Sequence, residues 1–212
     1  MVYNILNTGS DGNCIIVNDI VALDMGVPFK KIEPYINKIK LVFISHKHGD
    51  HLNLSTVRKI HELRPTIRFC IGEFLYQELA EAGISKRNID IIKHGKVYDY
   101  KILKVSPFIL IHDVFNYGLR LFMNGEKLLY AVDTSTLDHV SAKNYDCYLI
   151  EANYDEEVLE ENLKSDLENS GFSYNSRVKE THLSVNQASE FILNNIGENS
   201  KYEFIHRSKR NL

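Results

Sequence analysis

Metal-binding side chains gather in one short stretch of the chain, Ser45-His46-Lys47-His48-Gly49-Asp50-His51. The stretch directly follows the apolar run Leu41-Val42-Phe43-Ile44, which predicts a buried strand. Imidazole and carboxylate groups without a thiolate are typical ligands of zinc, manganese or iron. Because side chains alternate along a strand and the chain then turns, ligands this close in sequence can serve two neighbouring ions. The stretch therefore predicts a metal site at the end of a strand.

Four later segments also carry histidine or aspartate: Ile111-His112-Asp113, Tyr130-Ala131-Val132-Asp133-Thr134, Thr181-His182-Leu183-Ser184 and Ile205-His206-Arg207-Ser208. In this order, and together with the first stretch, they resemble the motifs of the metallo-β-lactamase superfamily. Two further segments, Gly9-Ser10-Asp11-Gly12-Asn13-Cys14 and Asp113-Val114-Phe115-Asn116-Tyr117, resemble its RNase Z-related phosphodiesterase branch and the YycJ/WalJ-like group within it. The resemblance implies an α/β (α+β) fold, a four-layered αββα sandwich that forms one domain over residues 1–212.

The same resemblance implies two divalent metal ions per chain, zinc first and manganese or iron as alternatives. The implied ligands are His46, His48 and His112 for the first ion, Asp50, His51 and His206 for the second, and Asp133 as the bridge. Two dications about 3.5–4 Å apart lower the pKa of a shared water and stabilise both oxygens of an in-line displacement. An alternative exchanges the late histidines, with His182 as the ligand; we favour His206 because it directly follows a predicted strand.

Three residues are predicted to act on the substrate: Asp50, His182 and Glu151. Asp50 can both bind a metal ion and accept a hydrogen bond from the attacking hydroxide. The pKa of histidine lies near working pH, which suits it to assist a scissile phosphate or protonate a leaving oxygen. The resemblance gives this role to His182 and the role of orienting it to Glu151. The alternative for His182 is a surface histidine near a helix cap.

Supporting roles are predicted for residues next to these motifs. Asp24 is expected to support residues 45–51, here called the ligand loop, by hydrogen-bonding to a metal ligand, since metal ligands generally need such partners. Ser10 and Asn13 lie in a glycine-flanked turn that borders the phosphate pocket in our interpretation, with a plain turn as the alternative. Thr134 and Ser208 are candidate hydrogen-bond donors to phosphate.

Turn residues and apolar runs predict the elements that position the site. Asn18-Asp19 and Asn124-Gly125 are typical of hairpin turns. Helical spacing over 54–63, with Val57, Ile60 and Leu63 on one stripe, predicts a helix that Pro65 closes. Further predicted elements are strands at 147–150 and 202–205, helices at 155–167 and 184–194, and a polar loop at 167–179.

Composition sets outer bounds on partners and location. The 212-residue chain has a net charge of −3, which argues against a large nucleic-acid footprint but not against a local groove. Its three cysteines lie far apart and predict buried thiols, and therefore a cytoplasmic protein. No apolar stretch approaches the roughly 18 residues of a membrane span, so no membrane partner is expected. A homodimer is the default assembly.

The functional prediction is a dinuclear-metal phosphodiesterase, with DNA cleaved by an exonuclease as the first choice. A cyclic nucleotide, opened by an enzyme of the phage anti-defence type, is the alternative substrate. Hydrolysis of a small ester, lactone or thioester is a second class, which the His182 motif and residues 113–117 argue against. A non-catalytic binding module is a third, which the presence of every expected ligand argues against.

Overall fold

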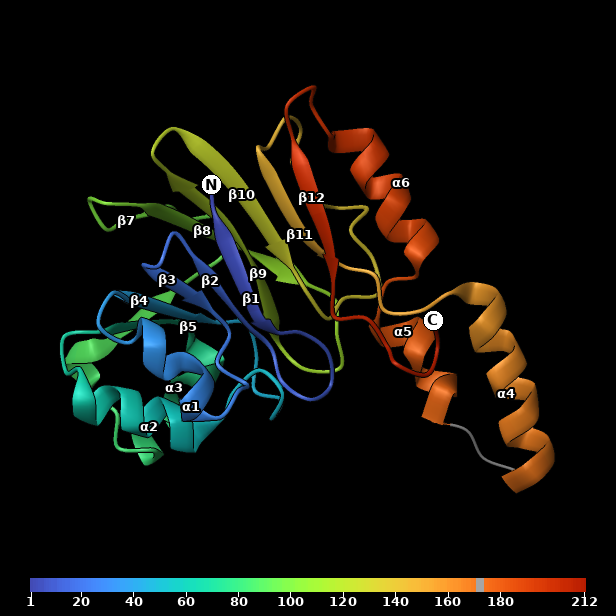
Figure 1. The fold of residues 1–212 in the computed structure, drawn as a ribbon, viewed down its shortest axis with the longest axis horizontal. Helices are drawn as coiled ribbons and strands as arrows, with labels where there is room; N and C mark the ends of the chain where they lie inside the picture. Colours follow the sequence, from blue (N-terminus) through green and yellow to red (C-terminus); the bar gives the residue numbers. More distant parts are fainter. Residues whose placement is uncertain (171–173) are drawn as a thin grey trace. The chain divides into compact units, whose positions relative to one another are not determined.

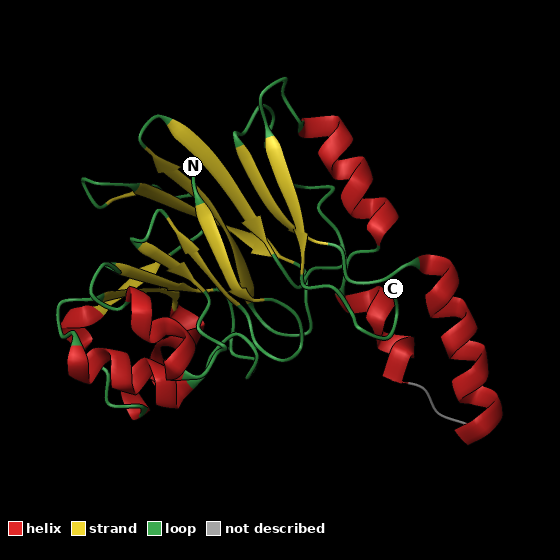
Figure 2. Ribbon diagram, viewed as in Figure 1, coloured by secondary structure: helices red, strands yellow, loops and turns green. Residues whose placement is uncertain are grey.

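The computed structural model describes residues 1–170 and 174–212 and contains two six-stranded sheets with helices. The chain divides into two compact units, Met1–Asp99 with Ser106–Phe108 and Tyr100–Val105 with Ile109–Leu212. Figure 1 labels the elements and Figure 2 separates helix from strand. The predicted α/β class is confirmed, whereas one domain over 1–212 stays a prediction.

The sheet of the first unit keeps its strands in sequence order: β1 (Tyr3–Asn7), β2 (Cys14–Val17), β3 (Val21–Leu23), β4 (Leu41–Ile44), β5 (Arg68–Gly72) and β6 (Ile89–Ile92). β1, β2 and β3 pair antiparallel, whereas β3 to β6 pair parallel. The turn between β2 and β3 has positive φ at Asn18 (47°) and Asp19 (59°), as a tight hairpin requires. The predicted hairpin is therefore confirmed.

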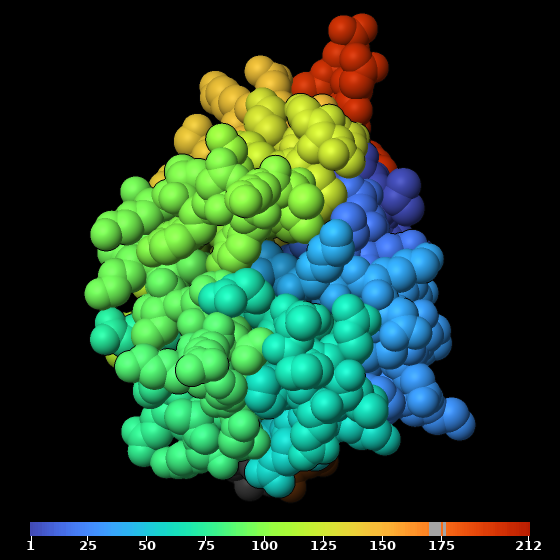
Figure 3. Space-filling view, turned by 90° about the vertical axis from the view of Figure 1, so that its left-hand side faces the viewer, coloured from blue at the N-terminus to red at the C-terminus, as the bar shows by residue number. Residues whose placement is uncertain are grey.

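Short helices accompany this sheet: α1 (Phe29–Ile32), η1 (Glu33–Tyr35), α2 (Leu54–Leu63), η2 (Glu73–Leu75), α3 (Tyr76–Glu81) and η3 (Lys86–Asn88). In Figure 1, α1, α2 and α3 gather beside one another, and Figure 3 shows the surface that α2, α3 and the segment leading to β6 form in blue-green and green. Val57 and Ile60 of α2 are fully buried in the core, as their spacing predicts. Leu63 is 55% exposed because the helix ends there.

The second sheet has the order β12-β11-β10-β9-β8-β7. Its strands are β7 (Tyr98–Asp99), β8 (Lys104–Leu110), β9 (Asn116–Met123), β10 (Glu126–Ala131), β11 (Cys147–Glu151) and β12 (Lys201–Ile205). β9 and β10 form the predicted hairpin, with positive φ at Asn124 (54°) and Gly125 (81°). β10, β11 and β12 pair parallel, so their carboxyl ends meet at one edge of the sheet.

The helices of the second unit are α4 (Glu156–Ser170), η4 (Tyr174–Arg177), α5 (Val178–Thr181) and α6 (Val185–Asn195). Ser184 and Gln187 form a capping box at the start of α6, which stabilises the exposed N–H groups there. The predicted loop at 167–179 is wrong where α4, η4 and α5 extend into it, and its residues 171–173 lie outside the described part. Tertiary hydrogen bonds from Asn175 to Asp166 (3.1 Å) and from Asn211 to Asn175 (3.0 Å) stabilise this polar segment.

The C-terminal residues pack beside α4, as Figure 1 also shows. Asp155 N–H donates to Asn211 O (2.8 Å), Asn162 donates to Arg210 O (3.0 Å), and Arg210 pairs with Asp166. Among the described residues, no helix is both long and apolar enough to cross a membrane. Cys14, Cys70 and Cys147 are buried with free thiols, as predicted.

Candidate active site

The ligand loop of the first unit begins where β4 ends. Because β3 and β4 are parallel neighbours, Asp24 at the end of β3 lies next to Ser45 at the end of β4. The Asp24 carboxylate accepts hydrogen bonds from Ser45 N–H (2.7 Å) and Ser45 Oγ (2.9 Å), and it lies 2.6 Å from His51 Nδ1. All three residues are fully buried. Asp24 thus fixes the His51 ring through Nδ1 and leaves Nε2 for a metal ion, the supporting arrangement typical of metal-bound histidine.

His46 and His48 follow in the same loop. The His46 ring is fully buried, and its Nδ1 lies 3.0 Å from Ser45 Oγ, so Nε2 is the nitrogen through which His46 would bind a metal ion. The centroid of the His46 ring lies 4.7 Å from that of His48 and 4.3 Å from that of His51. The loop turns back through hydrogen bonds from His51 N–H (2.9 Å) and Leu52 N–H (2.8 Å) to His48 O. Three imidazoles predicted as ligands are therefore side by side within this unit.

Asn13 supports the ligand loop from the turn between β1 and β2. Its Oδ1 accepts from Gly9 N–H (2.9 Å), and its Nδ2 lies 2.8 Å from His51 Nε2 and 3.3 Å from Asp50 Oδ2. The structure thus places Asn13 against two predicted ligands, whereas Ser10 is exposed in the same turn. The local contacts of Asn13 are those of a residue that positions ligands.

Gly26 lets three segments of backbone meet behind the loop. Gly26 N–H donates to Asn13 O (2.9 Å), Asn13 N–H donates to Asp50 O (2.6 Å), and Met25 N–H donates to His51 O (2.9 Å). A Cβ on Gly26 would lie 1.7 Å from Asp50 O, closer than any side chain tolerates. No role for Gly26 is predicted from the sequence, although its place two residues after Asp24 is a local signal.

Gly26→Ala is expected to displace the ligand loop and lower the metal content of the purified protein, because the new Cβ collides with the Asp50 carbonyl. Elemental analysis and the thermal unfolding midpoint measure the effect. Gly49→Ala is the matched control, since a Cβ there meets nothing within 4 Å although Gly49 lies in the same loop. Equal metal content in the two variants would show that the close backbone contact between Gly26 and Asp50 does not position the ligands.

The second unit brings together three residues at the carboxyl ends of its parallel strands. Asp133 follows β10, Glu151 ends β11 and His206 follows β12. Asp133 and His206 both have left-handed backbone, with φ of 55° and 52°. Asn116 at the start of β9 donates from Nδ2 to Val132 O (2.8 Å) and Asp133 O (2.7 Å), which holds the turn that aims Asp133. Sequence analysis assigned no role to Asn116.

His182 completes a compact cluster with these residues. One ligand atom from each of Asp133, Glu151, His182 and His206 lies within 4.8 Å of the others. His182 Nδ1 lies 2.5 Å from Glu151 Oε1, and His206 Nδ1 lies 3.1 Å from Asp133 Oδ1 and 3.2 Å from Glu151 Oε1. The His182 and His206 rings stack with centroids 5.5 Å apart. Both late histidines therefore face the same two carboxylates.

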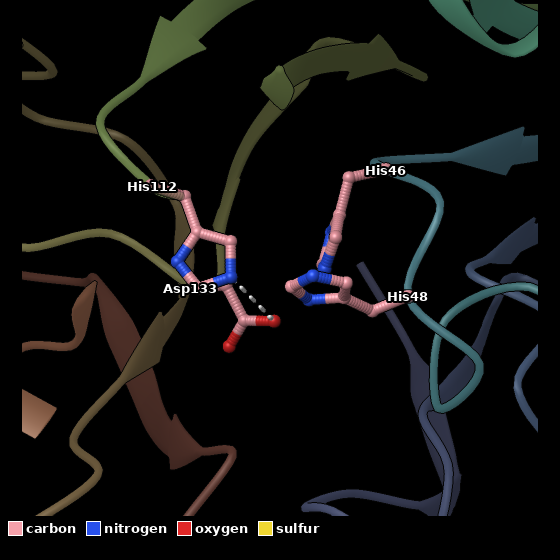
Figure 4. Close-up of side chains that lie close together, drawn as sticks. All are labelled: His46, His48, His112 and Asp133. Atoms are coloured by element: carbon pink, nitrogen blue, oxygen red, sulfur yellow. Dashed lines mark ion pairs between the residues drawn. The ribbon is translucent and has the colours of Figure 1, made fainter. Parts of the chain in front are cut away.

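His112 reaches this cluster from the loop after β8. Its Nδ1 donates to Thr181 O (3.0 Å), so its Nε2 is directed toward Asp113 Oδ1 (3.2 Å) and Asp133 Oδ2 (4.0 Å). Figure 4 draws the side chains of His112 and Asp133, and its dashed line marks the ion pair between them. The donor set of each unit, imidazole and carboxylate with one ring nitrogen engaged by the protein, fits a divalent metal ion.

The carboxylates of the cluster control the charge of His182. Burial alone would lower the pKa of His182, but Glu151 and Asp133 outweigh burial and raise its pKa to about 10. Burial would likewise raise the pKa of Glu151, but His182 and His206 outweigh burial and lower it. Burial lowers the pKa of His112 against the opposing charges of Asp133 and Asp113. In the metal-free protein His182 is therefore an imidazolium at neutral pH, with a proton held between Nδ1 and Glu151.

Glu151→Gln is expected to lower the pKa of His182 in the metal-free protein, since it removes the carboxylate that stabilises the imidazolium. In the native chain the His182 ring should stay protonated until pH rises toward about 10. Histidine NMR titration measures both values, with His182→Ala identifying the resonance. A native His182 that titrates near the ordinary value of about 6.5 would contradict the assigned ion pair.

Thr134 and Ser208, the predicted phosphate donors, make contacts with the backbone. Thr134 is fully buried; its hydroxyl donates to Thr136 O (2.9 Å) and accepts from Ile111 N–H (3.0 Å). Its N–H donates to Glu151 Oε2 (3.0 Å). Ser208 Oγ accepts from Arg210 N–H and Asn211 N–H, both at 3.2 Å. These contacts give Thr134 and Ser208 a role in holding loops beside the cluster.

Sequence relatives of this chain differ in how much of it they match. Exodeoxyribonuclease WalJ of Streptococcus pneumoniae serotype 2 (strain D39) is 25% identical over 231 residues, covering 99% of this chain and 82% of that protein. Cytidine monophosphate-N-acetylneuraminic acid hydroxylase of Sus scrofa is 30% identical over 63 residues, but the match covers 28% of this chain and only 14% of that protein. The similarity to WalJ therefore extends over nearly the whole chain.

Solved structures share the fold at low sequence identity. The metallo-β-lactamase fold protein YhfI from Bacillus subtilis has a TM-score of 0.73 and 13% identity, with 99% of this chain and 87% of that chain covered. The short form of human tRNase Z has a TM-score of 0.67 and 15% identity, with coverages of 99% and 94%. A family model described as "Beta-lactamase superfamily domain" matches residues 6–206. With its two sheets and its histidine and aspartate clusters, the chain therefore belongs to the β-lactamase superfamily, with the metallo-β-lactamase fold.

Proposed function

We propose that this protein is a dinuclear-metal phosphodiesterase that cleaves nucleic acid, with DNA as its substrate and exonucleolytic cleavage as its mode. The observation that carries the proposal is the His182–Glu151 pair, with Nδ1 and Oε1 2.5 Å apart beside Asp133. Metal ligation alone does not explain a charged histidine held by a buried carboxylate that is not itself an expected ligand. A proton donor next to a metal site is what departure of an alkoxide oxygen requires.

The proposed metal ligands follow the pattern that the superfamily uses. His46, His48 and His112 would hold one ion, Asp50, His51 and His206 the other, and Asp133 both. A metal ion on His51 Nε2 would replace the contact of that nitrogen with the Asn13 amide. Bound ions would supply Lewis-acid stabilisation of the phosphate and a water of lowered pKa. Zinc is the proposed metal, with manganese or iron as the alternatives.

The remaining steps belong to residues of the chain. Asp50 would accept a hydrogen bond from the attacking water and orient it toward phosphorus. His182 would carry its proton to the leaving oxygen, and Glu151 would hold the ring through Nδ1 so that Nε2 faces the substrate. In the metal-free protein Glu151 and Asp133 raise the pKa of His182, and the Glu151 carboxylate would favour the protonated ring during the reaction as well. Asp24, Asn13 and Asn116 would position the ligands without touching the substrate.

The WalJ relative supports DNA as the substrate, because its name states that activity and its match spans 99% of this chain. The net charge of −3 favours a short contact with the polymer over a long one. A cyclic nucleotide is the alternative substrate, because the net charge and the chain length do not separate it from DNA. A cytoplasmic location and a homodimer stay predictions from the sequence.

Incubation of the metal-loaded protein with a pool of single- and double-stranded DNA, RNA and cyclic mononucleotides tests the proposal, with products identified by mass spectrometry. Stepwise release of mononucleotides from DNA is expected. Ring opening of a cyclic nucleotide with DNA intact would replace DNA by the alternative substrate. A lactone and a thioester are assayed in parallel, and their hydrolysis without any phosphodiester cleavage would contradict the proposal altogether.

A further inference from the structure

An exposed aromatic ring stands in the loop that carries His112. Phe115 is 79% exposed, more than any other large apolar side chain in the described part of the chain. Ile109 and Ile111, which precede the loop, are 46% and 47% exposed. These three exposed apolar side chains, termed the apolar patch, come from one short stretch of the chain, and exposed apolar groups that cluster mark binding surfaces more often than single ones do.

The loop is anchored to the candidate active site on both sides of Phe115. On one side, His112 Nδ1 donates to Thr181 O, and His112 Nε2 faces Asp133. On the other, Asn116 is buried and holds the backbone of Asp133. Three residues of chain span at most about 10 Å, so the Phe115 backbone lies within that distance of the His112 backbone. A side chain on this backbone is close enough to reach groups beside a phosphate bound next to His112.

A cation accompanies the ring. The Arg177 guanidinium pairs with Asp113 Oδ2 (3.0 Å), and its side chain is 69% exposed. Asp113 Oδ1 in turn lies 3.2 Å from His112 Nε2. The loop therefore presents the apolar ring of Phe115, and Asp113, two residues earlier in the loop, holds the Arg177 guanidinium. A nucleotide has the matching parts, an aromatic base that stacks and a phosphate that attracts arginine.

We propose that Phe115 stacks on a nucleobase next to the scissile phosphodiester while Arg177 faces a neighbouring phosphate. The inference rests on the proposed function and deepens it, since it commits the site to substrates with a base. A phosphodiester without a base would leave the ring and the adjoining isoleucines exposed to water. The apolar patch thus provides selection for nucleotides, and the stacking is tolerant of base identity because every base has a π-face.

Binding measurements test the inference separately from catalysis. Fluorescence anisotropy of labelled single-stranded oligodeoxynucleotides with cleavage-resistant phosphorothioate linkages would compare normal strands with strands of abasic residues. We expect the wild type to prefer the normal strand, and Phe115→Ala to reduce that preference roughly 5- to 100-fold, the range that loss of one stacked base gives. Phe115→Trp should restore the preference. Leu193→Ala, at a side chain 78% exposed on α6, is the control that should leave the preference unchanged.

Arg177→Ala should weaken binding of normal and abasic strands alike and reduce the slope of log affinity against log salt by about 1. Equal affinity of the wild type for normal and abasic strands would overturn the inference. So would a Phe115→Ala variant that changes only its oligomeric state in sedimentation, because the patch would then be a contact between copies of the chain. Base-dependent binding without any cleavage would instead support the inference and refute the proposed function.

Discussion

His182→Ala is expected to retain its metal ions while losing roughly 100- to 10,000-fold in phosphodiester turnover, the range that a positioned proton donor contributes. The physical reason is the geometry of the pair with Glu151. The His182 ring is held at 2.5 Å by the buried Glu151 carboxylate, which with Asp133 raises the pKa of His182 in the metal-free protein. We therefore expect its removal to take away a proton donor and not a metal ligand. Elemental analysis and steady-state hydrolysis, measured on the same preparation, give both quantities.

His94→Ala is the matched control for this variant, because His94 is an exposed histidine elsewhere in the chain and its removal should change neither quantity. Substrates with a good leaving group supply a second check, since departure of a stable phenolate needs less protonation and should be less impaired in His182→Ala. Loss of metal from His182→Ala would invert the assignment of the two late histidines and make His206 the outer residue.

His46→Ala is expected to abolish activity through loss of the first metal ion. His46 is fully buried, its Nδ1 lies against Ser45 Oγ, and its Nε2 is the nitrogen left for metal. Removal of an outer partner of a metal ligand alone costs roughly 10- to 100-fold in affinity, so removal of the ligand itself should cost more. Competition with a chromophoric chelator measures the affinity, and hydrolysis measured in parallel gives the activity.

Lys47→Ala provides the control in this case, since Lys47 is exposed in the same loop and is not an expected ligand. It should keep the metal affinity and activity of the native protein. A His46→Ala variant with full metal content and full turnover would show that His46 is not a metal ligand.

Much of the first unit's site could be predicted because its residues follow local signals. The apolar run 41–44 becomes β4, and the histidines directly follow it. Asp24 was predicted as a support and accepts from Ser45 and His51, since β3 and β4 pair in parallel with close ends. The roles of Asn13 and Gly26 could not be predicted in the same way. Their contacts depend on hydrogen bonds among three backbone segments that are distant in sequence, and the spacing of residues in the sequence does not reveal which segments lie side by side.

In the second unit, too, some features could be predicted from local sequence signals and others could not. The hairpin at Asn124-Gly125 was predictable from turn chemistry, whereas the parallel order of β10, β11 and β12 was not. That strand order brings Asp133, Glu151 and His206 together. The cluster could therefore be predicted from the family resemblance but not from any local sequence pattern. The part of the predicted loop at 174–179 is helical instead, because its polar side chains are satisfied by tertiary hydrogen bonds, such as those of Asn175.

Whether this protein is a dinuclear-metal phosphodiesterase can be tested by titrating the metal-free protein with zinc while native mass spectrometry and hydrolysis of a DNA phosphodiester are measured in parallel. We expect the protein to take up two ions per chain and hydrolysis to rise with the second. Saturation at a single ion, or a fully loaded protein that leaves the phosphodiester intact, would contradict that expectation.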